Sequence, residues 1–189
     1  YMSNLWFMPS TPVLSNGGTD RGLPISCFLN EATDSLDGIV NLWNENVWLA
    51  SLGGGIGSYW GNLRSIGEKV GANGKTSGII PFIRVMDSLT LAISQGSLRR
   101  GSAAIYIRVD HPEIEEFIEL RRPTGGDPNR KAQNLHHGVL VSDAFMRAVE
   151  ADERHRSATV SLHLALSEAV AACPQRRQAR AVVHVEHLQ

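Results

Sequence analysis

Short apolar stretches alternate with helical patterns as far as Asp152, and this alternation constrains the fold more than any other feature of the chain. Strands are predicted over residues 23–29, 58–66, 103–109 and 135–141; helices are predicted over 34–52, 79–94, 110–122 and 142–152. Strands that alternate with helices indicate an α/β domain.

The helix boundaries follow from capping patterns. Asp34 is expected to be the N-cap of the first long helix, which should end at Gly53-Gly54-Gly55. Asp110-His-Pro-Glu113 has the spacing of a capping box, with an acidic N-cap and Glu at N3. Ser142 is expected to cap the helix that follows the last strand.

Composition limits the classes of function. The formal net charge of −1 provides no electrostatic argument for binding nucleic acid or an acidic membrane. Two cysteines, Cys27 and Cys173, do not make a disulfide framework, so we expect a reducing, cytoplasmic location. No apolar run approaches the roughly 20 residues of a membrane span. The chain opens on Tyr1 in mid-pattern, as expected for a piece of a longer protein.

The composition changes abruptly after residue 152. Residues 153–189 are rich in Ala, Arg and His, and no turn or glycine signal joins them to the preceding pattern. We therefore divide the chain into a domain at 1–152 and an atypical tail at 153–189. A helix is possible over 161–173, and an out-of-frame or recombined origin is one hypothesis for the tail.

Three motifs do not match the sites that they resemble. The glycines at 53–57 follow a helix and lack the GxGxxG spacing of a dinucleotide site. Gly74-Lys75-Thr76 lacks the first glycine of a P-loop, although either loop can still hold phosphate through backbone amides. His136 and His137 alternate on a strand and face opposite sides, so we predict no metal site there.

Two further stretches leave alternatives open. The segment Gln95–Gly101 places Arg99 and Arg100 between glycines, which suits either anion or base recognition or a solvated basic turn. Cys27 taken alone is expected to be a small buried side chain.

Taken together, several segments resemble the large (alpha, catalytic) subunit of ribonucleotide reductase, most closely the class I ribonucleoside-diphosphate reductases. The segments, in family order over about residues 1–152, are MPSTPVLSNGG, LPISCFL, DSLDGI, WLASLGGGIG, ISQGSLRRGSAAIY, HPEIEEFIELRR and NLHHGVLVSDAFM. The resemblance implies part of a ten-stranded α/β barrel and a radical-based reduction of ribonucleotides to deoxyribonucleotides.

The resemblance also implies site residues. Cys27 matches one of two thiols that deliver the reducing electrons and become a disulfide, a role that suits exchange with another dithiol. Thr11, Ser26 and Gly55 match substrate-contacting positions.

Asp34, Ser35, Leu36 and Arg64 match the specificity site, where a deoxynucleoside triphosphate or ATP acts as allosteric effector. The start of a helix suits such a ligand because free amides favour phosphate, whereas Asp34 would more readily bond the sugar. Gln95 and Arg99 match the loop that relays effector identity to the substrate base. The helices that begin near 34 and 79 match the homodimer interface, and their apolar faces fit either that interface or core packing within one chain.

The chain also departs from the family. Gly71 stands where some members carry a second effector arginine. The Asn-x-Cys-x-Glu segment with the radical cysteine and the second reducing cysteine are absent, so the isolated chain is expected to be inactive. The resemblance implies no cofactor on this chain, a radical-generating small subunit and a thioredoxin- or glutaredoxin-type reductant. The alternatives are an adenosylcobalamin-dependent (class II) reductase and a non-catalytic nucleotide-binding remnant.

Overall fold

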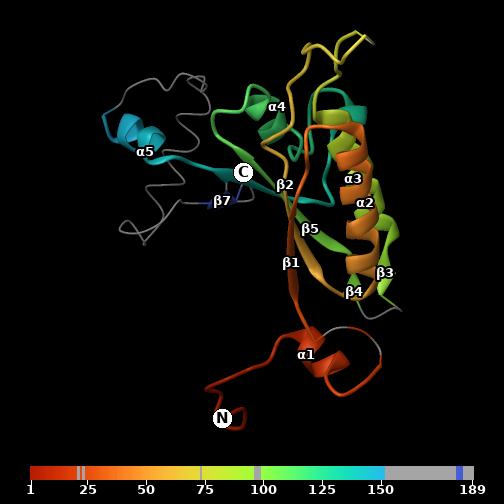
Figure 1. Cartoon of the computed structure of the whole chain (residues 1–189). Helices are drawn as coiled ribbons and strands as arrows, with labels where there is room; N and C mark the ends of the chain where they lie inside the picture. Colours follow the sequence, from red (N-terminus) through yellow and green to blue (C-terminus); the bar gives the residue numbers. More distant parts are fainter. Residues whose placement is uncertain (21, 23, 73, 96–98, 152–181, 185–189) are drawn as a thin grey trace.

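The protein forms an α/β fold around a five-stranded sheet of order β1-β2-β5-β6-β7, which confirms the predicted fold class (Figure 1). A computed structural model describes residues 1–20, 22, 24–72, 74–95, 99–151 and 182–184. Among these residues no helix combines the length and apolar character that crossing a membrane requires.

The elements have the following bounds. The helices are α1 (Thr11–Asn16), α2 (Leu36–Ser51), α3 (Ile80–Ala92), α4 (Ile114–Glu119) and α5 (Asp143–Glu150), with a 3₁₀ turn, η1, at Pro128–Arg130. The main sheet consists of β1 (Cys27–Glu31), β2 (Gly55–Tyr59), β5 (Ser102–Arg108), β6 (His136–Leu140) and β7 (Val182–His184). A separate pair consists of β3 (Ser94–Gln95) and β4 (Arg99–Arg100).

The first four strands of the main sheet are parallel, and β7 joins antiparallel to β6. Parallel neighbours need crossover connections, which α2, α3 and α4 supply. The register aligns Cys27 with Gly55 and Gly55 with Ser102, so the first residues of three strands form one row.

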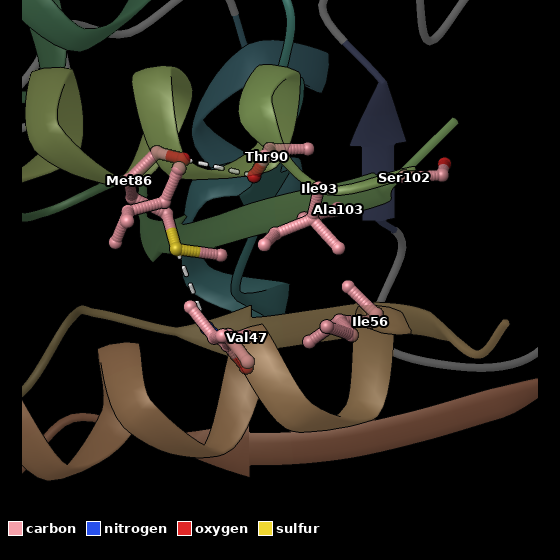
Figure 2. Close-up of a pocket in the computed structure, with 10 residues that line it drawn as sticks. Val47, Ile56, Met86, Thr90, Ile93, Ser102 and Ala103 are labelled. Atoms are coloured by element: carbon pink, nitrogen blue, oxygen red, sulfur yellow. Dashed lines mark hydrogen bonds between the residues drawn. The ribbon is translucent and has the colours of Figure 1, made fainter. Parts of the chain in front are cut away.

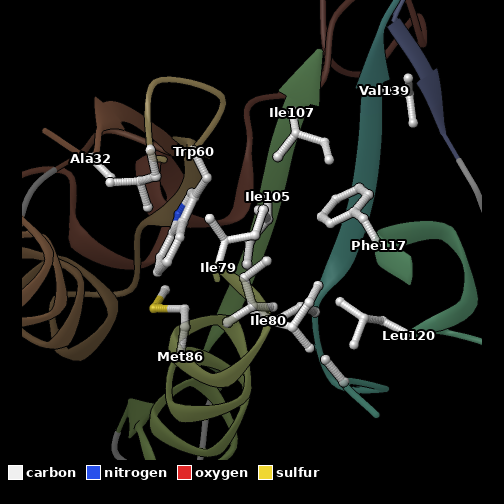
Figure 3. Close-up of a cluster of buried hydrophobic side chains, with 14 of the residues drawn as sticks. Ala32, Trp60, Ile79, Ile80, Met86, Ile105, Ile107, Phe117, Leu120 and Val139 are labelled. Atoms are coloured by element: carbon white, nitrogen blue, oxygen red, sulfur yellow. The ribbon is translucent and has the colours of Figure 1, made fainter. Parts of the chain in front are cut away.

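One face of this sheet carries the hydrophobic core. Alternate residues of β2 and β5 are buried, including Ile56, Ile105 and Ile107, because successive side chains of a strand point to opposite faces. They pack beside Trp60, Met86 and the α4 side chains in one cluster (Figure 3). Each fully buried aliphatic side chain contributes about 1.5–3 kcal/mol, so this face is the main source of stability.

A buried polar triad lies within this apolar face. Ser58 Oγ donates to Asn30 Oδ1 at 2.7 Å, and Asn30 Nδ2 donates to Asn46 Oδ1 at 2.9 Å. Asn46 Nδ2 closes the ring by donating to Ser58 Oγ at 3.2 Å. Asn46 and Ser58 are 3% and 0% exposed, so their mutual hydrogen bonds offset the cost of removing them from water. The triad ties α2 to β1 and β2.

Two strand predictions were misplaced. The second strand was predicted at 58–66 but occupies Gly55–Tyr59, because pairing with β1 and β5 draws the glycines at 55 and 57 into the sheet. Glycine has no side chain to reveal the alternation. The first strand was predicted from residue 23 but begins at Cys27, after Pro24, which cannot donate a ladder hydrogen bond.

Two of the three predicted helix caps were wrong. The N-cap of α2 is Ser35, whose Oγ accepts from Gly38 N at 3.0 Å, because the Asp34 carboxylate is bound by Arg64 instead. The capping box at 110–113 does not form: α4 begins at Ile114 and the Glu113 carboxylate binds a distant loop.

Of the predictions for residues after 141, the structure tests the Ser142 cap but neither Cys173 nor the possible helix at 161–173. Ser142 is confirmed as the cap of α5, since its Oγ accepts from Phe145 N at 3.2 Å. Cys173 and the possible helix at 161–173 lie outside the described residues. From the predicted tail at 153–189, the structure describes only the backbone of β7.

Candidate functional site

The face of the sheet opposite the core carries the predicted redox thiol. Cys27 is the first residue of β1 and its side chain is exposed. The expectation of a buried cysteine from residue type alone is therefore wrong. The register places Cys27 beside Gly55, and strand alternation directs both to this open face.

The strand next to this thiol has glycine at Gly55, in register with Cys27. Gly55 N donates to Ser26 O at 2.7 Å, so the predicted substrate positions 26 and 55 are joined through the backbone. A Cβ on Gly57 would lie 2.8 Å from Leu29 Cδ2, and Leu29 itself is 86% exposed. The Leu29 side chain therefore lies over Gly57, whereas the missing side chain at Gly55 lets another group approach the backbone closely beside Cys27.

Thr11, the remaining predicted substrate residue, is the exposed first residue of α1, which lies beyond the amino end of β1 (Figure 1). The chain between them passes close to the end of α2. A Cβ on Gly22 would lie 3.2 Å from the Asn16 side-chain nitrogen and 3.1 Å from Leu52 O. Thr11, Ser26, Cys27 and Gly55 therefore all belong to the amino end of the sheet.

The basic segment at 95–101 also lies at this end. It was predicted as a loop, but its arms pair as β3 and β4, with Gln95 opposite Arg99. Gly101 N donates to Ile93 O at 2.8 Å and closes the base of this hairpin. Because β5 begins at Ser102, the hairpin enters the sheet level with Cys27. The positions of the Gln95 and Arg99 side chains fall outside the described part of the structure.

The four predicted effector residues meet at the opposite, carboxyl end of the sheet. Arg64 Nη2 lies 2.9 Å from Asp34 Oδ2, and Arg64 Nε and its backbone amide donate to Asp34 Oδ1 at 2.9 and 3.1 Å. These hydrogen bonds hold the pKa of Asp34 below its ordinary value. Ser35 and Leu36 follow at the start of α2, where Leu36 is 66% exposed.

This end has the electrostatics of an anion site with a hydrogen-bond acceptor beside it. The start of α2 carries the positive end of the helix dipole, and Arg64 adds a guanidinium whose side chain is 34% exposed. The Asp34 carboxylate repels phosphate and can accept from a hydroxyl. The geometry therefore suits a ligand with both phosphate and sugar.

Two helices connect the two ends. α2 begins next to Asp34 and ends before Gly53-Gly54, which lead directly into Gly55. α3 begins at Ile80 and ends before the β3–β4 hairpin. A 16-residue helix such as α2 spans about 24 Å at 1.5 Å per residue. Each helix is thus a rigid link from the predicted effector end to the predicted substrate end.

None of the predicted site residues lines either of two cavities in the described part of the chain. A gap of about 10 Å³ between α2, α3 and the sheet has room for one water molecule at most, so it is no ligand site (Figure 2). An open pocket of about 290 Å³ lies between α3 and the segment that follows α4. There Arg84 Nη1 donates to Lys131 O, which holds that segment against α3.

Sequence reasoning missed two buried polar side chains near the effector end, His111 and Glu113. Both contact the chain on either side of Arg64: His111 through Leu63 O and Glu113 through Ile66 N. The motif His-Pro-Glu was a signal, but it was interpreted as local helix capping.

Comparison with known proteins places this geometry in a family. Residues 25–171 match the family described as ribonucleotide reductase, barrel domain. The chain is 44% identical over 153 residues to the putative ribonucleoside-diphosphate reductase large subunit of Frog virus 3, covering 81% of this chain and 26% of the relative. It is 36% identical over 156 residues to the vitamin B12-dependent ribonucleoside-diphosphate reductase of Mycobacterium tuberculosis, covering 82% and 22%.

A solved structure agrees. The Actinobacillus ureae class Id ribonucleotide reductase alpha subunit superposes with a TM-score of 0.68 and 31% identity, covering 81% of this chain and 27% of that subunit. The chain spans between a fifth and a third of the length of these relatives, as the shares of 22–27% show. It belongs to the ribonucleotide reductase family and forms part of the barrel domain of the large subunit.

Proposed function

We propose that this chain is the part of a class I ribonucleoside-diphosphate reductase that carries one reducing thiol, the first substrate contacts and the effector site. The observation that supports it best is the exposed Cys27 in register with Gly55, a residue without a side chain. The basic hairpin enters the sheet at the same level.

The amino end of the sheet supplies half of the reductant. In the proposed reaction, a thiyl radical on another cysteine abstracts the 3′ hydrogen of a ribonucleoside diphosphate. The 2′ hydroxyl leaves as water with a proton from one thiol, and the other thiol hydrogen takes its place at C2′. Cys27 and the second thiol thereby give up two electrons and become a disulfide. The radical cysteine then returns the 3′ hydrogen, which restores its thiyl radical. An exposed thiol can both reach the substrate and exchange with a thioredoxin- or glutaredoxin-type dithiol. The second thiol and the radical cysteine lie outside this sequence, so the isolated chain is expected to be inactive.

The carboxyl end binds a deoxynucleoside triphosphate or ATP in this proposal. The phosphates lie beside Arg64 and the start of α2, and Asp34 accepts from the sugar. The identity of the bound nucleotide is relayed to Gln95 and Arg99 through α2 and α3. Because the contacts between Asp34 and Arg64 form within this chain, effector binding is expected even where turnover is not.

The outer faces of α2 and α3 suit the proposed homodimer. They expose large apolar side chains, among them Val40 at 47%, Trp48 at 65%, Val85 at 41% and Leu91 at 56%. Apolar side chains gathered on neighbouring helices mark an interaction surface. The radical-generating small subunit is the second proposed partner.

Two alternatives have specific support. The vitamin B12-dependent relative favours an adenosylcobalamin-dependent reductase as the parent enzyme. A non-catalytic nucleotide-binding role is favoured by the presence of Asp34, Ser35, Leu36 and Arg64 in a chain without the radical cysteine.

The decisive experiment is Cys27→Ser in a large subunit that carries this segment, with Ser77→Ala at an exposed loop position as control. The assay measures deoxycytidine diphosphate formed from cytidine diphosphate with the small subunit and a dithiol reductant. We expect complete loss of turnover with Cys27→Ser, unchanged effector affinity and normal activity for the control. Turnover by the Cys27→Ser variant would contradict the proposal. Activity with adenosylcobalamin in place of the small subunit would favour the class II alternative.

A further inference from the structure

Two buried polar side chains, His111 and Glu113, form hydrogen bonds to the backbone near the predicted effector residue Arg64. His111 and Glu113 are 5% and 4% exposed, and they lie just before α4 at the carboxyl end of β5 (Figure 1). Their ring and carboxylate hydrogen bonds go mostly to distant parts of the chain, although the pair occupies a position where a capping box was expected.

The contacts of these side chains bracket Arg64. His111 Nε2 donates to Leu63 O at 3.1 Å, and His111 Nδ1 accepts from Glu113 N at 3.1 Å. Glu113 Oε2 accepts from Ile66 N at 3.1 Å. The residue before Arg64 and the second residue after it are therefore both fixed to this turn.

The Glu113 carboxylate also closes the loop that follows Arg64. Ile79 N donates to Glu113 Oε2 at 3.1 Å, so one carboxylate joins residues 66 and 79, the two ends of the loop. Within the loop, Gly67 N donates to Thr76 O at 2.9 Å. The loop in turn supports the guanidinium, because Arg64 Nη1 donates to Lys69 O at 2.9 Å.

The surroundings of this carboxylate are closely fitted. A Cβ on Gly78 would lie 2.2 Å from Glu113 Oε1, and Gly78 has a φ of +81°, a conformation that favours glycine. Burial raises the pKa of Glu113 while the amides of Ile79 and Ile66 oppose that shift. The carboxylate is stabilised there by its amide donors, and the amides of Ile66 and Ile79 lose this acceptor without it.

We propose that Glu113, assisted by His111, is a positioning residue for the effector site. Glu113 holds the backbone that follows Arg64 and His111 holds the residue before it, so that the guanidinium stays opposite Asp34. The inference rests on the proposed effector role of Arg64 and adds a residue that does not touch the ligand. Its effect on the ligand passes through Arg64.

The test is a double-mutant cycle with Glu113→Gln and Arg64→Gln. The glutamine keeps the size of the side chain but places an NH₂ donor among amide donors. Dissociation constants for dTTP and dGTP are measured by calorimetry on the full chain and its variants. Glu115→Gln, an exposed position on α4, is the matched control.

We expect Glu113→Gln to weaken binding about tenfold, the equivalent of roughly 1.4 kcal/mol. In the Arg64→Gln background the same substitution is expected to change affinity less than about twofold, because coupled residues are not additive. A merely structural role would give equal effects in both backgrounds. Equal effects, or unchanged affinity for Glu113→Gln, would overturn this inference.

If Glu113→Gln does not fold, amide hydrogen exchange of the unsubstituted chain tests the same contacts. The amides of Ile66 and Ile79 in the unsubstituted chain are expected to exchange more slowly than that of Ala72 at the loop tip. Fast exchange at both would overturn the inference without any variant. If the unsubstituted chain binds neither nucleotide, the proposed effector site itself fails. Binding that is insensitive to Glu113→Gln removes the positioning role alone.

Discussion

The two faces of the main sheet differ in what they contribute. The covered face holds interdigitated side chains, including Ile56, Ile105 and the buried triad around Asn46. The open face holds Cys27 beside the glycines of β2. The covered face stabilises the fold, and the open face is accessible to a ligand. A side chain that is packed on all sides cannot contact a ligand. Strand alternation lets one strand serve both.

The largest expected difference between the faces concerns apolar truncation. Ile105→Ala is expected to destabilise the protein by about 2–5 kcal/mol, because it removes a fully buried side chain and leaves a cavity. Leu29→Ala on the open face is expected to change stability by less than about 0.5 kcal/mol, since Leu29 is 86% exposed. Urea denaturation followed by circular dichroism compares them. Similar costs would contradict the division between the faces.

A matched pair of glycines sharpens the comparison. In Gly54→Ala the new Cβ would lie 2.4 Å from the Phe28 ring, and a cost of about 1–3 kcal/mol is expected from overpacking. In Gly57→Ala the Cβ would meet Leu29 Cδ2, the end of an exposed flexible side chain, which can move. Midpoints of chemical denaturation for the two variants test this. Gly57→Ala should be the more stable, and the reverse order would break the comparison.

The buried triad tests whether the covered face tolerates polar groups only when they are paired. Asn46→Ala would remove a partner from both Asn30 and Ser58, and we expect about 1–3 kcal/mol of destabilisation. Asn44→Ala, on the exposed side of the same helix, is the control. The free energy of unfolding is measured for both variants. Equal values would show that the hydrogen bonds of the triad do not stabilise the protein.

The smallest effect is expected at the exposed pair of Asp34 and Arg64. Arg64→Gln should raise the pKa of Asp34 towards its ordinary value, because the hydrogen bonds from Arg64 lower it. The sign follows: a lowered carboxyl pKa adds stability above the ordinary pKa, and this is lost as the pH falls through the lowered value. Carbon-detected NMR titration of Asp34 measures the shift. An unchanged pKa in Arg64→Gln would show that the pair does not persist in solution.

Much of the fold could be predicted from local pattern, and the failures have a common cause. The α/β class, the long helices α2 and α3, and the Ser142 cap were correct, because periodicity and a hydroxyl before a helix act within a few residues. The strand at 55–59 was predicted too late in the chain, at 58–66, because glycines show no alternation. Its existence depends on pairing with two distant strands.

For the candidate site too, the sequence predicted the residues and the structure shows which of them lie together. The motifs around Cys27 and Asp34 predicted a substrate site and an effector site, and the structure brings Asp34, Ser35, Leu36 and Arg64 together. It also joins Ser26 to Gly55 through the backbone. The roles of these residues stay predictions.

The sequence by itself determined the alternation of strands and helices, the family and the residues that carry the proposed chemistry. The tertiary structure alone decided which partner each carboxylate takes. Asp34 and Glu113 both stand where a helix could use them as caps, yet they bind Arg64 and the amides of Ile66 and Ile79. A carboxylate binds the donors that the fold brings to it. A guanidinium 30 residues away offers charge-assisted hydrogen bonds that a local amide cannot match.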